Sequence, residues 1–293
     1  TITDITPDGR RLVIERDRKG EENPGVYLQD IEGGALSVVQ HKEGVQTMAQ
    51  FVSDDGRFLY YASNDVQPDA YALYRYDLAS GARERILDRS GLWSIADHRP
   101  EGRLLLRRET GSLTAEYWEL APGDAAPRPL FGQDEPAEYT AQYGADPGAL
   151  LVVTPKFSEF RRAYRWRAGK FTPLTPELTW DVSGLQIDHA RRRIVYTVNE
   201  AGYTRLHAMD ARTGAPLALP EFKGADHVFP GPSTPDGRFL ALAVETSQAP
   251  PTSYVLDWQT GALTRWVVPS APEFDTRRFA GATLEYYPAR DGA

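Results

Sequence analysis

The sequence of 293 residues contains no cysteine, which excludes a disulfide scaffold, thiolate catalysis and a zinc site with cysteine ligands. It also has no Asn-x-Ser/Thr acceptor for glycosylation. We find no signal peptide and no apolar run of about 18 residues, so the sequence predicts no membrane-spanning segment and no membrane partner. The lack of cysteine fits a cytoplasmic protein, and we expect that location.

Positive charge is also in deficit. Lys and Arg total 33 against 41 Asp and Glu, which gives a formal net charge of −8. A nucleic-acid-binding protein needs a basic surface to displace the counterions around the phosphates. We therefore expect no nucleic-acid partner, and the mild acidity is interpreted as a contribution to solubility.

Aromatic residues, glycine and proline are plentiful. The chain has 15 Tyr and 6 Trp, together with 25 Gly and 22 Pro. Aromatic segments separated by Gly and Pro turns favour an all-β domain, and no run shows a long helical period. The length is compatible with a single all-β domain.

The strongest feature of the sequence is an internal repeat. An acidic residue, a glycine and an arginine stand together in four places, and two degenerate copies lie before the last: Asp8-Gly9-Arg10, Asp55-Gly56-Arg57, Glu101-Gly102-Arg103, Asp146-Pro147-Gly148, Asp188-His189-Ala190-Arg191 and Asp236-Gly237-Arg238. The first three steps are 47, 46 and 45 residues, and the remaining 90 residues accommodate two more. Each copy is followed by an apolar run.

A second marker has the same period. It is an aromatic-rich segment that ends in a glycine, at Gly33, Gly81, Gly123, Gly169, Gly214 and Gly261. From Gly81 onward the steps are 42, 46, 45 and 47 residues. Two independent markers with one period indicate six structural repeats.

Each repeat reads as four short strands. In the second repeat these are about Thr47 to Ser53, Arg57 to Ser63, Ala72 to Leu78 and Arg83 to Leu87. Asp-Gly supplies the tight turn between the first two strands, and Ser80-Gly81 supplies the turn between the last two, because these residues tolerate positive φ.

These repeats predict a β-propeller of about six four-stranded antiparallel blades. A lone four-stranded sheet with two apolar faces is not stable in water, whereas radial stacking buries both faces. A β-helix has much shorter repeats, and separate sandwiches have more strands per unit. We place the propeller domain at residues 1–272 and a linker or tail at residues 273–293.

Searches for catalytic, cofactor-binding and metal-binding patterns find none. The string nearest to a serine-hydrolase elbow is Gly231-Pro232-Ser233-Thr234-Pro235. It lacks the last glycine, and its two prolines prevent the helix that should follow, so we interpret it as a blade loop. No phosphate-binding loop or dinucleotide fingerprint occurs. We therefore assign no catalytic residue, no cofactor and no metal ligand.

The histidines and charged clusters are interpreted as structural. The five histidines are not at zinc-ligand spacing, and most are expected on blade surfaces or in turns: His41, His98, His189, His207 and His227. Two basic clusters are expected on solvated blade faces: Arg161, Arg162, Arg165, Arg167 and Lys170, and Arg191 to Arg193. The oxygen-rich segment Asp17 to Asn23 lacks the spacing of a calcium loop and is expected to connect the second and third strands.

Several strings resemble the propeller of the prolyl oligopeptidase family of serine peptidases, especially its acylaminoacyl-peptidase-like branch. They are Asp17-Arg18-Lys19-Gly20-Glu21-Glu22-Asn23-Pro24, Trp180-Asp181-Val182, Asn199-Glu200-Ala201-Gly202, Thr234 to Phe239 with Ser247 to Pro251, and the tail from Phe279 to Ala293. The tail ends in Tyr286-Tyr287-Pro288-Ala289-Arg290-Asp291-Gly292-Ala293 and resembles the segment that enters the α/β-hydrolase domain.

The resemblance implies a catalytic partner outside these residues. In the family the Ser-Asp-His triad lies in the hydrolase domain after the tail, so no catalytic residue is carried over to this chain. Some relatives hold a free peptide amine with a paired-glutamate helix, but Glu21-Glu22 is expected in a strand-connecting loop. The family often has one more blade upstream, which leaves a seven-bladed propeller open.

Two functions remain open from the sequence. The first is the substrate-gating propeller of a serine peptidase, with a C-terminal α/β-hydrolase domain of the same parent chain and short peptides as partners. The second is a stand-alone binding or scaffold propeller of the TolB or WD40 type. The tail favours the first, because a free-standing propeller has no need of a hydrolase-entry segment.

Overall fold

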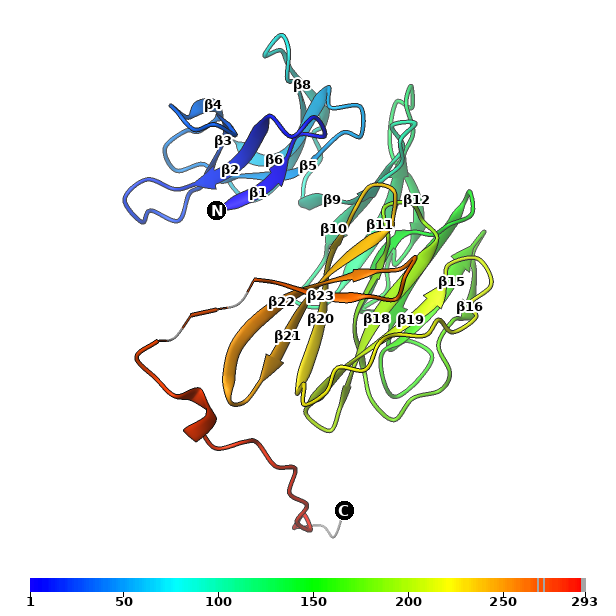
Figure 1. The fold of residues 1–293 in the computed structure, drawn as a ribbon. Coiled ribbons are helices and arrows are strands. Elements are labelled where there is room, and N and C mark those ends of the chain that lie inside the picture. The colour runs from blue at the N-terminus through cyan, green and yellow to red at the C-terminus, as the bar shows by residue number, and fades with distance from the viewer. Residues whose placement is uncertain (268, 271, 291–293) are drawn as a thin grey trace. The chain divides into compact units, whose positions relative to one another are not determined.

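The computed structural model describes residues 1–267, 269–270 and 272–290, and strands make up nearly all of its regular structure (Figure 1). The chain divides into two compact units, Thr1–Tyr143 and Gly144–Ala293.

The first unit contains thirteen strands. They are β1 (Ile2–Ile5), β2 (Arg11–Arg16), β3 (Gly25–Asp30), β4 (Ser37–Gln40), β5 (Thr47–Val52), β6 (Phe58–Gln67), β7 (Ala70–Asp77), β8 (Arg83–Leu87), β9 (Leu92–His98), β10 (Leu104–Glu109), β11 (Ala115–Leu120), β12 (Arg128–Phe131) and β13 (Thr140–Tyr143).

The described part of the second unit contains ten strands and one 3₁₀ turn. They are β14 (Ala149–Thr154), β15 (Arg162–Arg167), β16 (Lys170–Pro173), β17 (Val182–Ile187), β18 (Arg193–Glu200), β19 (Tyr203–Asp210), β20 (His227–Ser233), β21 (Phe239–Thr246), β22 (Ala249–Asp257), β23 (Leu263–Val267) and η1 (Thr276–Arg278).

The strands form antiparallel meanders with the predicted period. β1 to β4 and β13 to β16 are separate four-stranded sheets. β5 to β8 and β9 to β12 are two further meanders, joined by one parallel bridge between Tyr71 and Leu92. A bridge between Thr204 and His227 joins β17 to β19 with β20 to β23 in the same way. These six meanders are the blades of the β-propeller fold, and we number them in chain order.

The fifth blade departs from the expected four strands. After β19, the position of a fourth strand is occupied by one isolated bridge between Met209 and Pro216, together with a hydrogen bond from the Leu217 N–H to the Ala208 carbonyl. Pro216 and Pro220 have no N–H to donate to a ladder. The prolines explain why the segment does not continue as a strand.

The Asp-Gly turns form as the sequence predicts. In the second blade, the Ser53 hydroxyl donates to Asp55 at 2.6 Å, and Asp55 accepts from the Arg57 N–H at 3.0 Å. Gly56 has a φ of +69°, a conformation that L side chains rarely adopt. The first and sixth blades repeat this arrangement around Asp8 and Asp236.

The turn of the fifth blade, formed by the degenerate copy Asp188 to Arg191, is shifted along the sequence relative to the predicted alignment of the repeats. Asp188 lies where the other turns have Ser or Thr, because its N–H bonds the Arg193 carbonyl as the Ser53 N–H bonds that of Phe58. One Asp188 oxygen accepts from the N–H groups of Arg192 and Arg193, at 2.6 and 3.1 Å. Arg191, with a φ of +53°, occupies the glycine position.

Both faces of a central blade are buried, because successive side chains of a strand point to opposite faces. On β6, Leu59 and Tyr61 pack with the first blade, whereas Tyr60 and Ala62 pack with the third. In the second unit, β18 behaves in the same way. Ile194, Tyr196 and Val198 join the core shared with the fourth blade, and Val195 joins the core shared with the sixth.

A polar tie connects the first strands of successive blades. The Asp4 carboxylate accepts from the Val52 N–H at 2.9 Å, the Gln50 side chain accepts from the Ile95 N–H at 2.9 Å, and the Asp97 carboxylate accepts from the Tyr143 N–H at 2.7 Å. In the second unit, Gln186 donates instead, to the Gly231 carbonyl at 2.7 Å. We call these contacts the first-strand ties.

Candidate functional site

The two ends of every blade differ in chemistry. In a four-stranded meander, the turns after the first and third strands lie at one end, here called the Asp-Gly end. The turn after the second strand and the connection to the next blade lie at the other end, here called the loop end. The two ends are therefore described separately as candidate functional surfaces.

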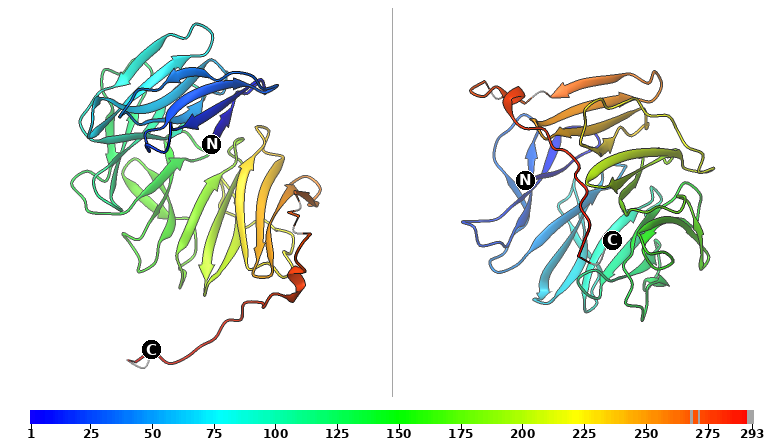
Figure 2. Two further views of the ribbon diagram at one scale, coloured as in Figure 1. Left: turned by 90° about the vertical axis from the view of Figure 1, so that its left-hand side faces the viewer. Right: turned by 90° about the horizontal axis from the view of Figure 1, so that it is seen from below.

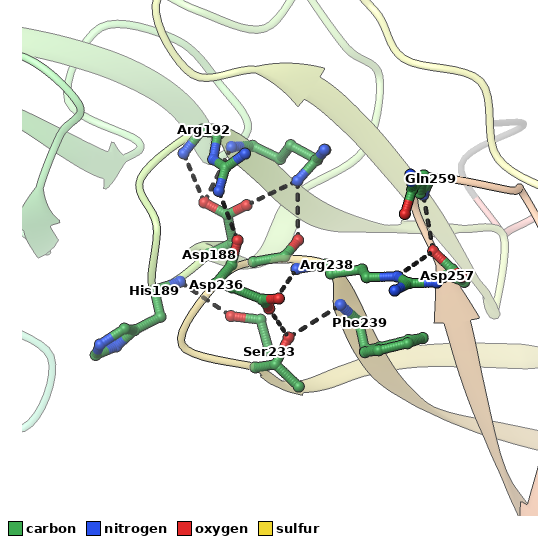
Figure 3. A network of polar contacts seen from close by, with 12 residues as sticks. Asp188, His189, Arg192, Ser233, Asp236, Arg238, Phe239, Asp257 and Gln259 are labelled. Atoms are coloured by element: carbon green, nitrogen blue, oxygen red, sulfur yellow. Dashed lines mark hydrogen bonds and ion pairs between the residues drawn. The ribbon is translucent and has the colours of Figure 1, made fainter. Parts of the chain in front are cut away.

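The Asp-Gly end of the second unit is an extended polar network (Figure 3). Arg193 Nη1 contacts Asp188 at 3.2 Å and donates to the Gly237 carbonyl at 2.9 Å, and Arg192 donates to the Asp236 carbonyl at 2.6 Å. These bonds join the turn of the fifth blade to that of the sixth. Arg192 is exposed, as the expected solvated face requires, and it also ties the two turns together, whereas Arg193 is half-buried between them.

The network continues along the sixth blade. The His189 N–H donates to the Ser233 hydroxyl at 2.9 Å, and Arg238 pairs with Asp257 at 2.8 Å. Ser233 is the last residue of β20, so the Gly231 to Pro235 string covers the end of a strand and the start of its turn, where a blade loop was expected.

The other basic cluster, Arg161 to Lys170, also makes mainly structural contacts. Arg165 donates to the carbonyls of Ala211 and Arg212 at 3.1 and 2.7 Å, and Arg162 donates to the Thr175 carbonyl at 2.6 Å. Guanidinium groups match this task, because one planar fork offers several donors to adjacent carbonyls. Only Arg167 and Lys170 of this cluster are exposed as expected.

The aspartates of these turns have lowered pKa values. Hydrogen bonds led by the Ser80 N–H lower the pKa of Asp77 to about 2, and the Arg238 side chain, donating to Asp257, is the largest cause of its pKa of about 2. The Thr6 and Ser53 hydroxyls lower the pKa values of Asp8 and Asp55 in the same way. Because these shifts come from turn hydrogen bonds, they mark structural carboxylates and not acid–base catalysts.

The histidines occupy five different settings. His189 is exposed in a turn, as expected, whereas the His41 side chain is only 1% exposed, so the surface interpretation is wrong for it. His98 Nε2 contacts Asp54 at 3.2 Å and its ring stacks on Phe51. His207 lies 3.5 Å from Glu200, and His227 contacts the Thr204 hydroxyl at 3.0 Å.

The loop end of the second unit carries exposed apolar residues and the tail. Phe157, in the β14–β15 connection, and Trp180, just before β17, are exposed at this end. After β23 the tail runs past the turns of the last blades (Figures 1 and 2). Its Phe279, Leu284, Tyr286 and Tyr287 are also exposed.

Two hydrogen bonds attach the tail to the β21–β22 turn. Gln248 Nε2 donates to the Phe279 carbonyl at 2.7 Å, and the Ala282 N–H donates to the Ser247 hydroxyl at 2.9 Å. A cavity of about 410 Å³ lies between the tail at Ala282 to Leu284 and the strand ends around Tyr203 and His227. Of the expected tail motif, Asp291, Gly292 and Ala293 lie outside the described residues.

The loop end of the first unit is also partly apolar. Val66, Leu92 and Leu113 are exposed there, at the β6–β7 hairpin, the start of β9 and the β10–β11 turn. The segment Asp17 to Pro24 connects β2 to β3 at this end, as the sequence predicts, and places Glu21-Glu22 in a loop. Together with Phe157 and Trp180 in the second unit, these residues make the loop end the candidate docking surface of each unit.

Metal-binding clusters and membrane-spanning helices are both absent from the described residues. Among residues 1–267, 269–270 and 272–290, no three His, Asp or Glu side chains gather closely enough to hold a metal ion. Within the same part of the chain, no helix has the length and apolar character needed to cross a membrane.

Sequence reasoning missed the first-strand ties and the buried histidine. The ties of the first unit had a detectable signal, because Asp4, Gln50 and Asp97 recur at steps of 46 and 47 residues. His41 had none, because its burial depends on contacts with β3 that are specific to the first blade.

Comparisons with known proteins identify the fold. No protein-family model and no curated protein matches this sequence. A structure from a study of inter-domain dynamics in two prolyl endopeptidases matches with a TM-score of 0.75 at 15% identity, over 93% of this chain and 43% of that one. Prolyl oligopeptidase B from Galerina marginata matches at 0.78 and 13% identity, over 99% and 45%. TolB from Acinetobacter baumannii matches at 0.61 and 16% identity, over 90% and 64%.

The similarity concerns the fold, and the fold is a β-propeller. The chain spans less than half the length of the two prolyl peptidases that it matches and about two thirds of TolB. Both expectations drawn from the repeats, an all-β chain and a propeller architecture, are confirmed.

Proposed function

We propose that this chain is the substrate-gating propeller domain of a serine peptidase of the prolyl oligopeptidase family, of acylaminoacyl-peptidase type. One observation carries the proposal: two prolyl peptidases match over 93% and 99% of this chain while over half of their own length lies outside the match. Residues 1–272 form the propeller domain, and residues 273–293 lead toward the α/β-hydrolase domain.

The loop end is the surface proposed to meet the hydrolase domain. The tail is hydrogen-bonded at this end of the second unit, through Ser247 and Gln248. A segment that connects two domains leaves the first one near their interface when the connection is short. Exposed aromatic and apolar residues such as Phe157 and Trp180 are the kind of surface that mark an interface.

The role proposed for the propeller is steric selection. Propellers surround a narrow central channel and carry their loops on two faces. Set against the mouth of a hydrolase, such a domain excludes folded proteins, admits short peptides and shields the triad from bulk water. The chemistry itself is assigned to the partner domain, and this chain is assigned no catalytic residue.

A TolB-like binding or scaffold propeller is the second candidate, and the TolB match at a TM-score of 0.61 favours it. The tail distinguishes the two functions, because Tyr286 and Tyr287 are 83% and 85% exposed. Adjacent exposed tyrosines are the kind of surface that an attached partner domain covers, which favours the first function.

The first experiment compares the parent's hydrolase domain with and without this chain, once the parent reading frame supplies that domain. We expect the two-domain protein to cleave a short acyl-peptide and to spare a folded protein of the same sequence context. Equal discrimination by a stable hydrolase domain alone would contradict the gating role. Labelling of this chain by a fluorophosphonate probe would contradict the assignment of the chemistry to the partner.

The second experiment tests the docking surface. The double variant Phe157→Ser, Trp180→Ser should weaken binding of the separately expressed hydrolase domain, measured by calorimetry, by at least tenfold. Ile31→Ser is the matched control, because Ile31 is an exposed apolar residue at the Asp-Gly end of its blade. An equal loss of binding in the control, or none in the double variant, would assign docking to another surface.

A further inference from the structure

His41 is a buried histidine with one unsatisfied ring nitrogen. It follows β4, and its Nδ1 is hydrogen-bonded with the Tyr27 hydroxyl on β3. Its Nε2 is buried and has no hydrogen-bond partner in the described structure. Because an unpaired buried polar atom costs free energy, this nitrogen requires a physical explanation.

The nearest charged group to this nitrogen is the Glu21 carboxylate. Glu21 Oε1 lies 3.6 Å from His41 Nε2, which is beyond hydrogen-bond distance but within the range of an ion pair. Glu21 belongs to the segment Asp17 to Pro24, and its side chain is 31% exposed. The carboxylate can therefore move toward or away from the ring without leaving water entirely.

The Asp17 to Pro24 segment has a strained conformation. Lys19 and Glu22 have φ values of +59° and +57°, which side-chain-bearing residues adopt only when surrounding contacts hold them. Two contacts hold the C-terminal half of the segment to the second blade. Gln46 Nε2 donates to the Glu22 carbonyl at 3.1 Å, and the Thr47 N–H donates to the Pro24 carbonyl at 2.8 Å.

We propose that proton binding to His41 latches the Asp17 to Pro24 segment onto the first blade through Glu21. In the neutral ring only one nitrogen carries a proton. When both carry one, Nδ1 donates to the Tyr27 oxygen and the cationic Nε2–H faces the Glu21 carboxylate. Acid pH then favours the latched segment, and alkaline pH releases it.

The other charged groups around the ring do not replace this pair. Lys42 follows His41 on its own segment and its side chain is exposed. Asp65, on β6, accepts hydrogen bonds from Gln40 and Tyr74. Glu21 and Tyr27 are the titratable groups in polar contact with the ring among the described residues, and Arg83, on β8, is hydrogen-bonded to Gln40, the residue before His41. The latch acts on the longest second-to-third-strand connection of the first unit and does not depend on the proposed peptidase function.

The test is amide hydrogen exchange of this chain, measured by mass spectrometry on peptides that cover residues 17–24. Glu21→Gln removes the charge at constant size, and Glu22→Gln is the matched control on the same segment. Each variant's rate is divided by the rate of the natural chain at the same pH. For Glu21→Gln we expect at least threefold faster exchange at pH 5.5 and a ratio near one at pH 8.5, with a ratio near one for the control at both.

The pH dependence separates a latch from a merely structural contact. A ratio for Glu21→Gln that is the same at both pH values, or that equals the control, would overturn the proposal. His41→Gln should also abolish the pH dependence of exchange in this segment. If that variant fails to fold, Glu21→Gln alone decides, because its side chain is partly exposed and the substitution keeps the size of the side chain.

Discussion

At the residue scale, single polar atoms join neighbouring blades in addition to the apolar cores between them. Asp4 shows how this works. One carboxylate oxygen accepts from the N–H of Ile5, its own neighbour, and the other accepts from the N–H of Val52 in the next blade. Val52 is buried, so its N–H has little water to replace that partner.

The first prediction is that Asp4→Ala destabilises the chain by about 1–3 kcal/mol, the cost of a buried donor left without its charged acceptor. Urea unfolding followed by tryptophan fluorescence measures the change in the free energy of unfolding. Asp4→Asn keeps an acceptor oxygen and should lose clearly less stability. If the two variants lose the same amount, the tie to Val52 is not the cause.

The second prediction concerns Gly25, the first residue of β3. A Cβ at this position would come within 2.5 Å of the His41 side chain, and the Tyr27 contact restricts how far that ring can move. Gly25→Ala should therefore cost about 1–3 kcal/mol by overpacking. Gly281→Ala is the control, since the nearest atom to its Cβ, Gln248 Nε2, is 3.7 Å away. The melting temperatures of the two variants are measured by thermal unfolding. Equal melting temperatures for Gly25→Ala and Gly281→Ala would contradict the prediction.

At the scale of the element, the turns are the most predictable part of the fold, because their chemistry is local. Asp-Gly at fixed spacing places a hydrogen-bonded carboxylate and a positive φ together, and both occur where the sequence indicates them. The position of the fifth turn was predicted two residues away from where it lies. Asp188 occupies the position of Thr6, and its carboxylate alone accepts the turn hydrogen bonds that Thr6 and Asp8 make together in the first blade.

Other features of the elements depend on contacts that the local sequence does not contain. The basic clusters gave no sign that Arg165 and Arg193 reach carbonyls 46 and 44 residues away. Pro216 and Pro220 indicate that the fifth blade has no regular fourth strand. This indication can be used only after the repeat period has shown where a fourth strand is expected. The sequence does not show which residues form the docking surface, because the exposure of a side chain depends on how the blades pack.

The third prediction is an acid limb of stability that comes from the turns. The pKa values of Asp77 and Asp257 lie at about 2, below the ordinary value of 3.8. A depressed pKa in the folded state means stability that is present above pH 3.8 and lost as the pH falls toward 2. The pKa of Glu15 is raised by burial and contributes with the opposite sign.

The measurement is the urea midpoint of unfolding between pH 6 and pH 2. Asp257→Asn should lower the midpoint at pH 6 and flatten its fall below pH 4. The exposed Asp69→Asn, in the β6–β7 turn, should leave both unchanged. Parallel profiles for the natural chain and Asp257→Asn would show that this carboxylate does not generate the acid limb.

At the scale of the whole molecule, the described chain is almost purely β, with one three-residue 3₁₀ turn. The fourth prediction is a far-ultraviolet circular dichroism spectrum dominated by β signal. A helix content above about a third, the level of an average globular domain, would contradict the fold. The architecture at this scale could be predicted from the sequence because one period repeats along the chain.

The first-strand ties also bear on how the chain is made. Each tie in the first unit spans 48, 45 or 46 residues and never skips a blade. A ribosome that adds 5 to 20 residues per second delivers the partner of each tie roughly 2 to 10 seconds after its anchor. The blades can therefore be registered one after another during synthesis, each on the one that has just emerged. A stall within a first strand would leave the preceding blade with an open acceptor and an uncovered apolar face.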